Sequence, residues 1–151
     1  MNQLAADRSA QINAAEAMCA RANESLTPLR RRVFELLLDR DGPVKAYDLL
    51  DDLKHAQASA KPPTVYRALD FLVRLGLAHR IESMNAFVAC DIGSCERSTI
   101  FLICERCGAS TEIDSGHALH DVSDAARRIG FALKRTVIEA SGLCARCAEA
   151  A

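Results

Sequence analysis

Apolar residues in the first half of the chain recur every three or four positions, which is the period of an amphipathic helix. The pattern predicts four helices, over residues 9–24, from residue 28 to the Asp41-Gly42-Pro43 sequence, over 46–55, and from residue 62 to Gly76. Thr27 is a suitable N-cap for the second helix, since Pro28 fits its first position. Cys19, in the first helix, is interpreted as a small core side chain.

After Gly76 the period of the pattern shortens and predicts strands. Residues 77–82 and 86–90 are two short apolar runs joined by a turn at residues 83–85, which predicts a β-hairpin. Helices followed by a hairpin are the outline of a winged helix-turn-helix. Beyond it, the pattern predicts strands at 99–104, 109–114 and 131–139, with a helix over 118–129. The predicted fold class is therefore α+β, with a winged-helix DNA-binding domain at 1–90, a hinge loop at 91–98 and a small α/β domain at 99–151.

Composition and charge narrow the class of protein. Half of the residues are hydrophobic (50%), which argues against intrinsic disorder. The net charge of −1 excludes binding to nucleic acid through bulk positive charge, although a local basic patch remains compatible with it. The sequence has neither the apolar run of a secretory signal nor that of a membrane span, so we expect a cytoplasmic protein without membrane contact. Disulfides are uncommon in the cytoplasm, and the seven cysteines therefore call for another explanation.

The helix that begins at Pro62 is the expected recognition helix. Its apolar face leaves Thr64 and Arg67 on another side, with Tyr66 beside them in the first turn. Arg67 could reach a guanine and Tyr66 a thymine methyl or a phosphate in the major groove. Further basic residues could neutralise DNA phosphates: Arg30, Arg31, Arg32 and Lys61. The pattern alone leaves open that these are ordinary solvated charges on amphipathic helices.

Two C-x-x-C pairs give the second half its strongest signal. The first pair is Cys104 and Cys107, followed by Gly108, and the second is Cys144 and Cys147. Four thiolates complete a closed tetrahedral zinc site, which is structural because no coordination position stays open. The other readings are a redox C-x-x-C, which would not need two copies, and unrelated core cysteines. The long segment between the pairs requires a whole structural unit between the two halves of the site.

The remaining thiols and imidazoles allow further metal sites. Two thiolates, an imidazole and a carboxylate would form a suitable zinc set from Cys90, Cys95, His79 and Glu112. No spacing specifies this group, and the alternative is a buried Cys90, a free thiol at Cys95 and surface residues elsewhere. His117 and His120 lie one turn apart on the predicted helix and could bind a metal, although such an exposed pair can equally be solvated.

Several motifs together resemble the ferric uptake regulator family. They are LTPLR at 26–30, AYDLL at 46–50, KPPTVYRALDFL at 61–72 and CERCG at 104–108. The zinc uptake regulator branch of that family is similar in three further runs, GLAHRIES at 76–83, NAFVAC at 85–90 and VIEASGLCARC at 137–147. The resemblance covers nearly the whole chain. It implies a homodimeric, metal-dependent repressor with a winged-helix domain and an α/β dimerisation domain.

The resemblance also implies roles for individual residues. The four cysteines of the two C-x-x-C pairs match the structural zinc site, and His79, Cys90 and Glu112 match three ligands of a regulatory zinc site near the hinge. The remaining ligand in the family is usually a histidine shortly before the first C-x-x-C, but the segment here has none. Cys95 is the expected substitute, with Glu96 as the alternative. Tyr66 and Arg67 match DNA-contact positions.

The expected function is repression of zinc-uptake genes when zinc is plentiful, on a palindromic, AT-rich operator and with one structural and one regulatory zinc ion per chain. An iron- or peroxide-responsive member of the family is the first alternative, but the two cysteines in the regulatory set favour zinc. A zinc-stabilised interaction module is the second. An enzyme is not expected, because the sequence has no glycine-rich phosphate loop, no H-E-x-x-H helix and no nucleophile with a paired base.

Overall fold

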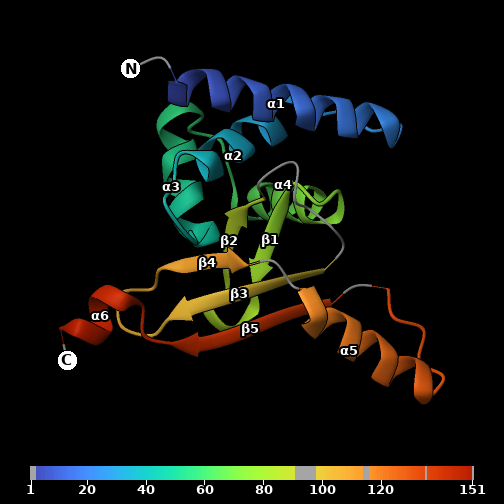
Figure 1. Cartoon of the computed structure of the whole chain (residues 1–151). Coiled ribbons are helices and arrows are strands. Elements are labelled where there is room, and N and C mark those ends of the chain that lie inside the picture. Colours follow the sequence, from blue (N-terminus) through green and yellow to red (C-terminus); the bar gives the residue numbers. More distant parts are fainter. Residues whose placement is uncertain (1–2, 91–97, 114–115, 135, 151) are drawn as a thin grey trace. The chain divides into compact units, whose positions relative to one another are not determined.

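The helices of the N-terminal unit follow the apolar period of the sequence. A computed structural model of the chain describes residues 3–90, 98–113, 116–134 and 136–150, and divides it into compact units at 1–94 and 95–151. The N-terminal unit contains helices α1 (Gln3–Arg21), α2 (Pro28–Leu38), α3 (Ala46–Ala56) and α4 (Pro62–Arg74) (Figure 1). As predicted, Pro28 opens α2, and the Thr27 side chain accepts a hydrogen bond from the N–H of Arg30 at 3.5 Å. The first helix ends at Arg21 rather than at residue 24, because Asn23 takes a left-handed conformation with a φ of 54°.

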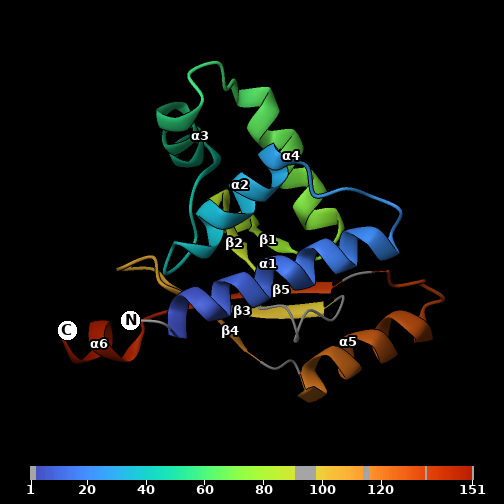
Figure 2. The same cartoon turned by 90° about the horizontal axis from the view of Figure 1, so that it is seen from above.

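The core of this unit lies where the four helices meet. Helix α2 packs against α1, α3 and α4, which Figure 2 shows from above. The largest fully buried side chains there come from several helices and include Phe34, Leu37, Leu49, Leu53, Leu69 and Leu72. Cys19 is also buried, as predicted for a core side chain. The extent of this core indicates that the N-terminal unit has its own hydrophobic source of stability.

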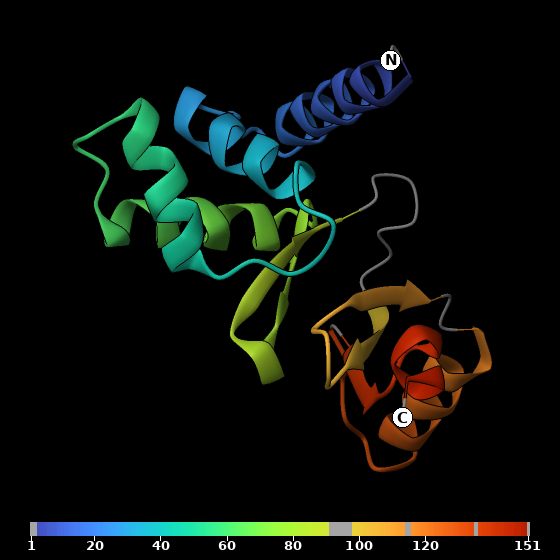
Figure 3. The same ribbon diagram turned by 90° about the vertical axis from the view of Figure 1, so that its left-hand side faces the viewer.

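A two-stranded antiparallel hairpin forms the wing. Strands β1 (Ala78–Ile81) and β2 (Ala86–Ala89) form this hairpin, which can be followed in Figure 3. In their pairing His79 lies opposite Val88. The expected turn is a short 3-10 helix, η1 (Glu82–Met84), closed by Asn85 with a φ of 47°. Val44 and Phe87 exchange two backbone hydrogen bonds of 2.8 Å, which fix the wing to the segment before α3.

The C-terminal unit is a three-stranded sheet with two helices. Its elements are β3 (Ser98–Cys104), β4 (Ser110–Ile113), α5 (Gly116–Arg128), β5 (Thr136–Gly142) and α6 (Ala145–Glu149). The strand order is β4-β3-β5, in which β3 is antiparallel to β4 and parallel to β5. The predicted strand at 131–139 is shifted to β5, because the parallel pairing aligns Thr136 with Ser98 and Gly142 with Cys104. The predicted α+β class is confirmed.

The C-terminal unit buries little of its apolar surface. Among the described residues of this unit, the buried apolar side chains are Ile100, Phe101 and Ile103 on β3, together with Cys104 at the end of that strand. Helix α5 has no buried residue, and Ile129 and Phe131 are 81% and 62% exposed. In the part of the chain that the structure describes, no helix has the length and apolar character needed to span a bilayer.

Candidate metal and DNA-binding sites

The two C-x-x-C pairs meet at one end of the C-terminal sheet. Cys104 ends β3, Cys107 lies in the turn after it, and Cys144 and Cys147 flank the start of α6. Although the pairs are far apart in sequence, the four sulfur atoms lie within 4.8 Å of one another. The parallel pairing of β3 and β5 explains this arrangement, because it brings the C-terminal ends of both strands to the same edge.

Backbone hydrogen bonds shape each half of the cysteine cluster. The N–H of Gly108 donates to the carbonyl of Cys104 at 2.9 Å, and the φ of 72° at Gly108 is one that a glycine adopts without strain. In the second half, the N–H of Cys147 donates to the carbonyl of Cys144 at 2.9 Å. The Arg106 side chain also donates to the Cys147 carbonyl, at 2.6 Å, and so joins the two halves.

Two thiols of the cluster have pKa values shifted in opposite directions. The backbone N–H of Cys144, which donates to the Cys104 sulfur at 3.4 Å, and that of Cys107 together lower the pKa of Cys104 to about 6. Hydrogen bonding to the Cys144 thiol and desolvation raise the pKa of Cys147 to about 12. One sulfur is therefore a thiolate at neutral pH, while another keeps its proton until a cation displaces it. Four clustered sulfurs fit zinc, for which a set of four cysteine ligands is a closed structural site.

His79 and Cys90 bring a second pair of metal-binding side chains together in the wing. Both are buried, and their ligand atoms lie within 4.8 Å of one another. The N–H of Cys90 donates to the Leu77 carbonyl at 2.9 Å, which fixes the residue at the end of the hairpin. Cys90 is disulfide-bonded in the structure, and zinc binding would require its reduced thiolate.

The other predicted metal ligands have different surroundings. Glu112 is half-buried on β4, where its carboxylate accepts a hydrogen bond from Thr99 at 3.4 Å. Cys95 and Glu96 lie outside the described residues. On the exposed face of α5, His120 pairs with Asp124 at 3.3 Å, and the potential metal-binding groups among the described residues include neither His120 nor His117.

Helix α4 presents the predicted DNA-contact residues to solvent. Val65, Ala68 and Leu69 are buried, whereas Lys61, Tyr66 and Arg67 are exposed and Thr64 is half-buried. Within the described ranges, no side-chain hydrogen bond or ion pair engages Lys61, Tyr66 or Arg67. Cation–π contacts among the described residues involve other arginines. The side chains of Lys61, Tyr66 and Arg67 are therefore available to a ligand without loss of an internal contact.

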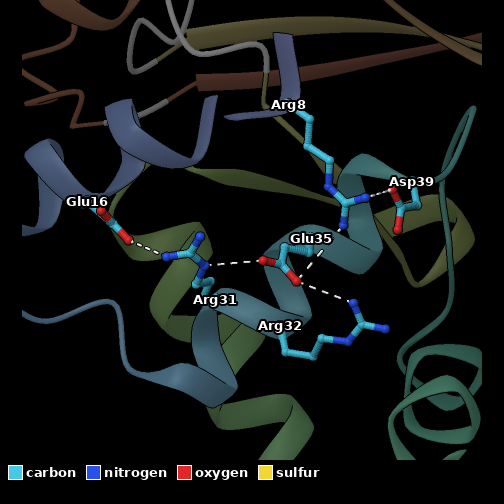
Figure 4. Close-up of polar contacts among 6 residues, drawn as sticks. All are labelled: Arg8, Glu16, Arg31, Arg32, Glu35 and Asp39. Atoms are coloured by element: carbon cyan, nitrogen blue, oxygen red, sulfur yellow. Dashed lines mark hydrogen bonds and ion pairs between the residues drawn. The ribbon is translucent and has the colours of Figure 1, made fainter. Parts of the chain in front are cut away.

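Two arginines of α2, Arg31 and Arg32, by contrast, already have carboxylate partners (Figure 4). Arg31 contacts Glu16 at 2.7 Å and Glu35 at 3.2 Å, and Arg32 contacts Glu35 at 3.3 Å. The pair with Glu35 is an i,i+4 contact that the sequence spacing could have indicated. The pair with Glu16 joins α2 to α1, and no local pattern predicts it. Arg31 remains a predicted phosphate contact, but DNA would compete there with these ion pairs.

A winged-helix unit followed by an α/β unit defines the class of this protein: a winged-helix protein whose second unit carries four clustered cysteines that could hold a metal ion. The sequence model described as "Ferric uptake regulator family" matches residues 22–141, and the chain belongs to this family. The resemblance that the sequence motifs indicate is thereby confirmed.

Individual relatives share most of the chain. The "Zinc uptake regulation protein" of Escherichia coli (strain K12) is 47% identical over 137 residues, which are 89% of this chain and 80% of that relative. A solved structure described as a zinc uptake regulator complexed with zinc and DNA has a TM-score of 0.88 and 44% identity, and the match covers 95% of this chain and 96% of that one. The crystal structure of holo XcZur has a TM-score of 0.82 and 42% identity, with 91% of this chain and 96% of that one covered.

Proposed function

We propose that this protein is a zinc-dependent, DNA-binding transcriptional repressor that acts as a dimer and silences zinc-uptake genes when zinc is replete. The observation that carries the proposal is the 47% identity with the zinc uptake regulation protein of Escherichia coli over 89% of this chain. The four-cysteine cluster and the exposed residues of α4 support it independently, because they supply a zinc site and a surface for the major groove.

In this proposal the four-cysteine cluster holds the structural zinc ion. Cys104 and Cys107 would bind it from the end of β3, and Cys144 and Cys147 from the start of α6. Zinc supplies, when bound, a cross-link between the two C-x-x-C pairs that the few buried side chains of this unit do not provide. The closed set of four thiolates leaves no position for a substrate, which agrees with a structural rather than a catalytic role.

The regulatory zinc ion is assigned to ligands from both units. His79 and Cys90 of the wing would bind it together with Glu112 of β4, and Cys95 is the proposed fourth ligand, with Glu96 as the alternative. The proximity of the His79 and Cys90 ligand atoms supports the wing half of this set. Two thiolates among the ligands favour zinc over iron or manganese, which prefer harder ligand sets.

Zinc could switch DNA binding on because the ligands of the regulatory site come from both units. A metal that binds both halves favours the arrangement in which they meet, and only this differential affinity can shift the equilibrium. In a dimer, one fixed arrangement sets the spacing of the two α4 helices so that they match successive half-sites of a palindromic, AT-rich operator. Arg67 and Tyr66 would then contact bases, while Lys61 and Thr64 would contact the backbone.

Metal analysis combined with a gel shift tests this proposal. We expect reduced protein to hold one tightly bound and one labile zinc ion per chain, and mild chelation to remove only the labile ion. A palindromic AT-rich duplex should be retarded before chelation, released after it, and retarded again when zinc is restored. A scrambled duplex of equal length and composition is the control. DNA binding that ignores the chelator would contradict the proposed switch.

A further inference from the structure

Arg30 differs from its neighbours on α2 because its contacts lead to the recognition helix. Its guanidinium carbon lies 3.6 Å from the centroid of the Phe71 ring, which is a stacking contact between a cation and an aromatic face. Phe71 belongs to α4 and is 4% exposed. Its ring is therefore part of the packed side of the recognition helix, and the flat face of Arg30 covers it.

The edge of the same guanidinium is also engaged. Arg30 donates a hydrogen bond to the Ser25 carbonyl at 2.8 Å and lies 3.9 Å from a carboxylate oxygen of Glu24. The other carboxylate oxygen of Glu24 contacts Arg74, the last residue of α4, at 2.8 Å. Arg74 also lies near the Phe71 ring, at 5.4 Å from its centroid. Glu24 therefore joins two arginines that approach one aromatic ring.

These contacts link three segments of the N-terminal unit. Glu24 and Ser25 lie in the connection between α1 and α2, Arg30 lies in the first turn of α2, and Phe71 and Arg74 lie in the last turn of α4. Tyr66 and Arg67 lie on the same helix, five and four residues before Phe71, which is little more than one turn away. A helix is a stiff rod, so a contact that holds its last turn also sets the direction in which its first turn points.

We propose that Arg30 is a positioning residue for the recognition helix rather than a contact to DNA phosphate. This inference rests on the proposed DNA-binding function. The Ser25 carbonyl and Glu24 both contact Nη1 of Arg30, and a phosphate contact would compete with them for that nitrogen. Through Phe71 and Glu24, Arg30 orients α4, and DNA affinity depends on it without any direct contact.

The salt dependence of DNA binding distinguishes the two roles. Each phosphate contact that is lost reduces the slope of log K against log salt by about 0.9. We expect Arg30→Ala to weaken zinc-dependent binding by about 2- to 30-fold, the range corresponding to one cation–π contact, at every salt concentration and with an unchanged slope. Arg30→Lys should show a similar loss, because lysine keeps the charge but lacks the flat face. The ratio of affinities for operator and scrambled duplex should fall in both variants.

Two matched variants serve as references. Arg31→Ala removes a neighbouring arginine of α2 that contacts carboxylates and makes no described contact with an aromatic ring of α4; as a predicted phosphate contact it should reduce the slope. Lys61→Ala removes a predicted phosphate contact and should reduce the slope. If Arg30→Ala instead reduces the slope, and Arg30→Lys restores both slope and affinity, Arg30 is a phosphate contact and the inference is wrong. If Arg30→Ala lowered the Tm but left the operator affinity unchanged at a temperature well below unfolding, the positioning role would also be overturned.

A measurement without DNA separates this inference from the proposed function. Hydrogen exchange in the free protein should become faster across the last turns of α4 in Arg30→Ala but not in Arg31→Ala. Unchanged exchange in α4 would overturn the positioning role, whatever the protein binds. If wild-type protein showed no zinc-dependent DNA binding while the exchange difference was present, the proposed function would fail and the contact to α4 would stand.

Discussion

Replacement of Cys104 by serine should unfold the C-terminal unit and leave the N-terminal unit folded. The substitution removes one of the four clustered sulfurs, and the hydroxyl that replaces it is not a zinc ligand of comparable strength. It also replaces the sulfur to which the N–H of Cys144 donates at 3.4 Å by a neutral hydroxyl, which is a weaker acceptor than a thiolate. The two C-x-x-C pairs would then lose the metal, and this direct hydrogen bond would weaken.

The expected size of the effect follows from what the C-terminal unit buries. Ile100, Phe101 and Ile103 are its large buried apolar side chains, and together they contribute about 5–9 kcal/mol. A structural zinc ion in a small domain contributes roughly 10–16 kcal/mol. The metal is therefore the larger of the two contributions. The N-terminal unit depends instead on the core formed by its four helices, and loss of zinc at Cys104 does not reduce that core.

Hydrogen exchange followed by mass spectrometry measures the protection of both units in one experiment on the full chain, and metal analysis measures the zinc content. Cys104→Ser should lack the tightly bound zinc and lose protection over residues 98–150, while the core helices keep theirs. Cys19→Ala is the matched control, since it removes a buried cysteine from the N-terminal core and should leave the zinc content unchanged. If Cys104→Ser retained tightly bound zinc and full protection of β3 and β5, the assignment of the four cysteines to one zinc site would be refuted.

Three further predictions concern DNA contacts, the fourth regulatory ligand and pH. Arg67→Ala should cost about 1–3 kcal/mol of operator binding and relax base preference in a binding-site selection assay, with an unchanged Tm because the side chain is exposed. A lowered Tm or unchanged base preference would argue against direct contact. Cys95→Ser should raise the zinc concentration needed for DNA binding without loss of the tightly bound zinc, and an effect of Glu96→Gln instead would move the fourth ligand to that position. Because the pKa of Cys147 is about 12, zinc must displace its proton, and the affinity of zinc-free protein for zinc should rise about tenfold per pH unit for that proton. Cys104, with a pKa of about 6, is already a thiolate above pH 7 and adds no such dependence there. Competition with a chelator at several pH values measures this, and a pH-independent affinity would contradict it.

Local features of the sequence predict most of the secondary structure. The Thr27-Pro28 start of α2, the apolar stripe of α4 and the hairpin after Gly76 depend on neighbouring residues, and the structure confirms them. The sequence pattern predicts the strand after α5 at residues 131–139, whereas β5 begins at Thr136. The position of β5 depends on its parallel pairing with β3, a strand distant in sequence. Apolar content alone made residues 131–135 resemble a strand, whereas Phe131 is exposed.

In the candidate sites, too, features that depend on neighbouring residues are predictable and contacts between distant residues are not. Repeated C-x-x-C spacing indicates the four-cysteine cluster, since each pair is local and two pairs complete a tetrahedral set. The ion pairs of Arg31 with Glu16, and of Arg74 with Glu24, join residues distant in sequence. No periodicity predicts such pairs, so the sequence alone does not distinguish Arg30 and Arg31 from unpaired basic residues. Only the structure distinguishes the exposed Arg67 from arginines that already have partners.

In the proposed switch, occupancy of a second, labile zinc site controls DNA binding. The most direct test of this switch is a titration with buffered free zinc in which operator binding, by fluorescence anisotropy, and zinc per chain are measured on the same reduced samples. We predict that operator affinity stays low while one zinc ion is bound per chain and rises as the second binds. His79→Ala should keep the first ion and lose the rise. Full operator affinity with a single zinc ion per chain would show that the second ion does not control DNA binding.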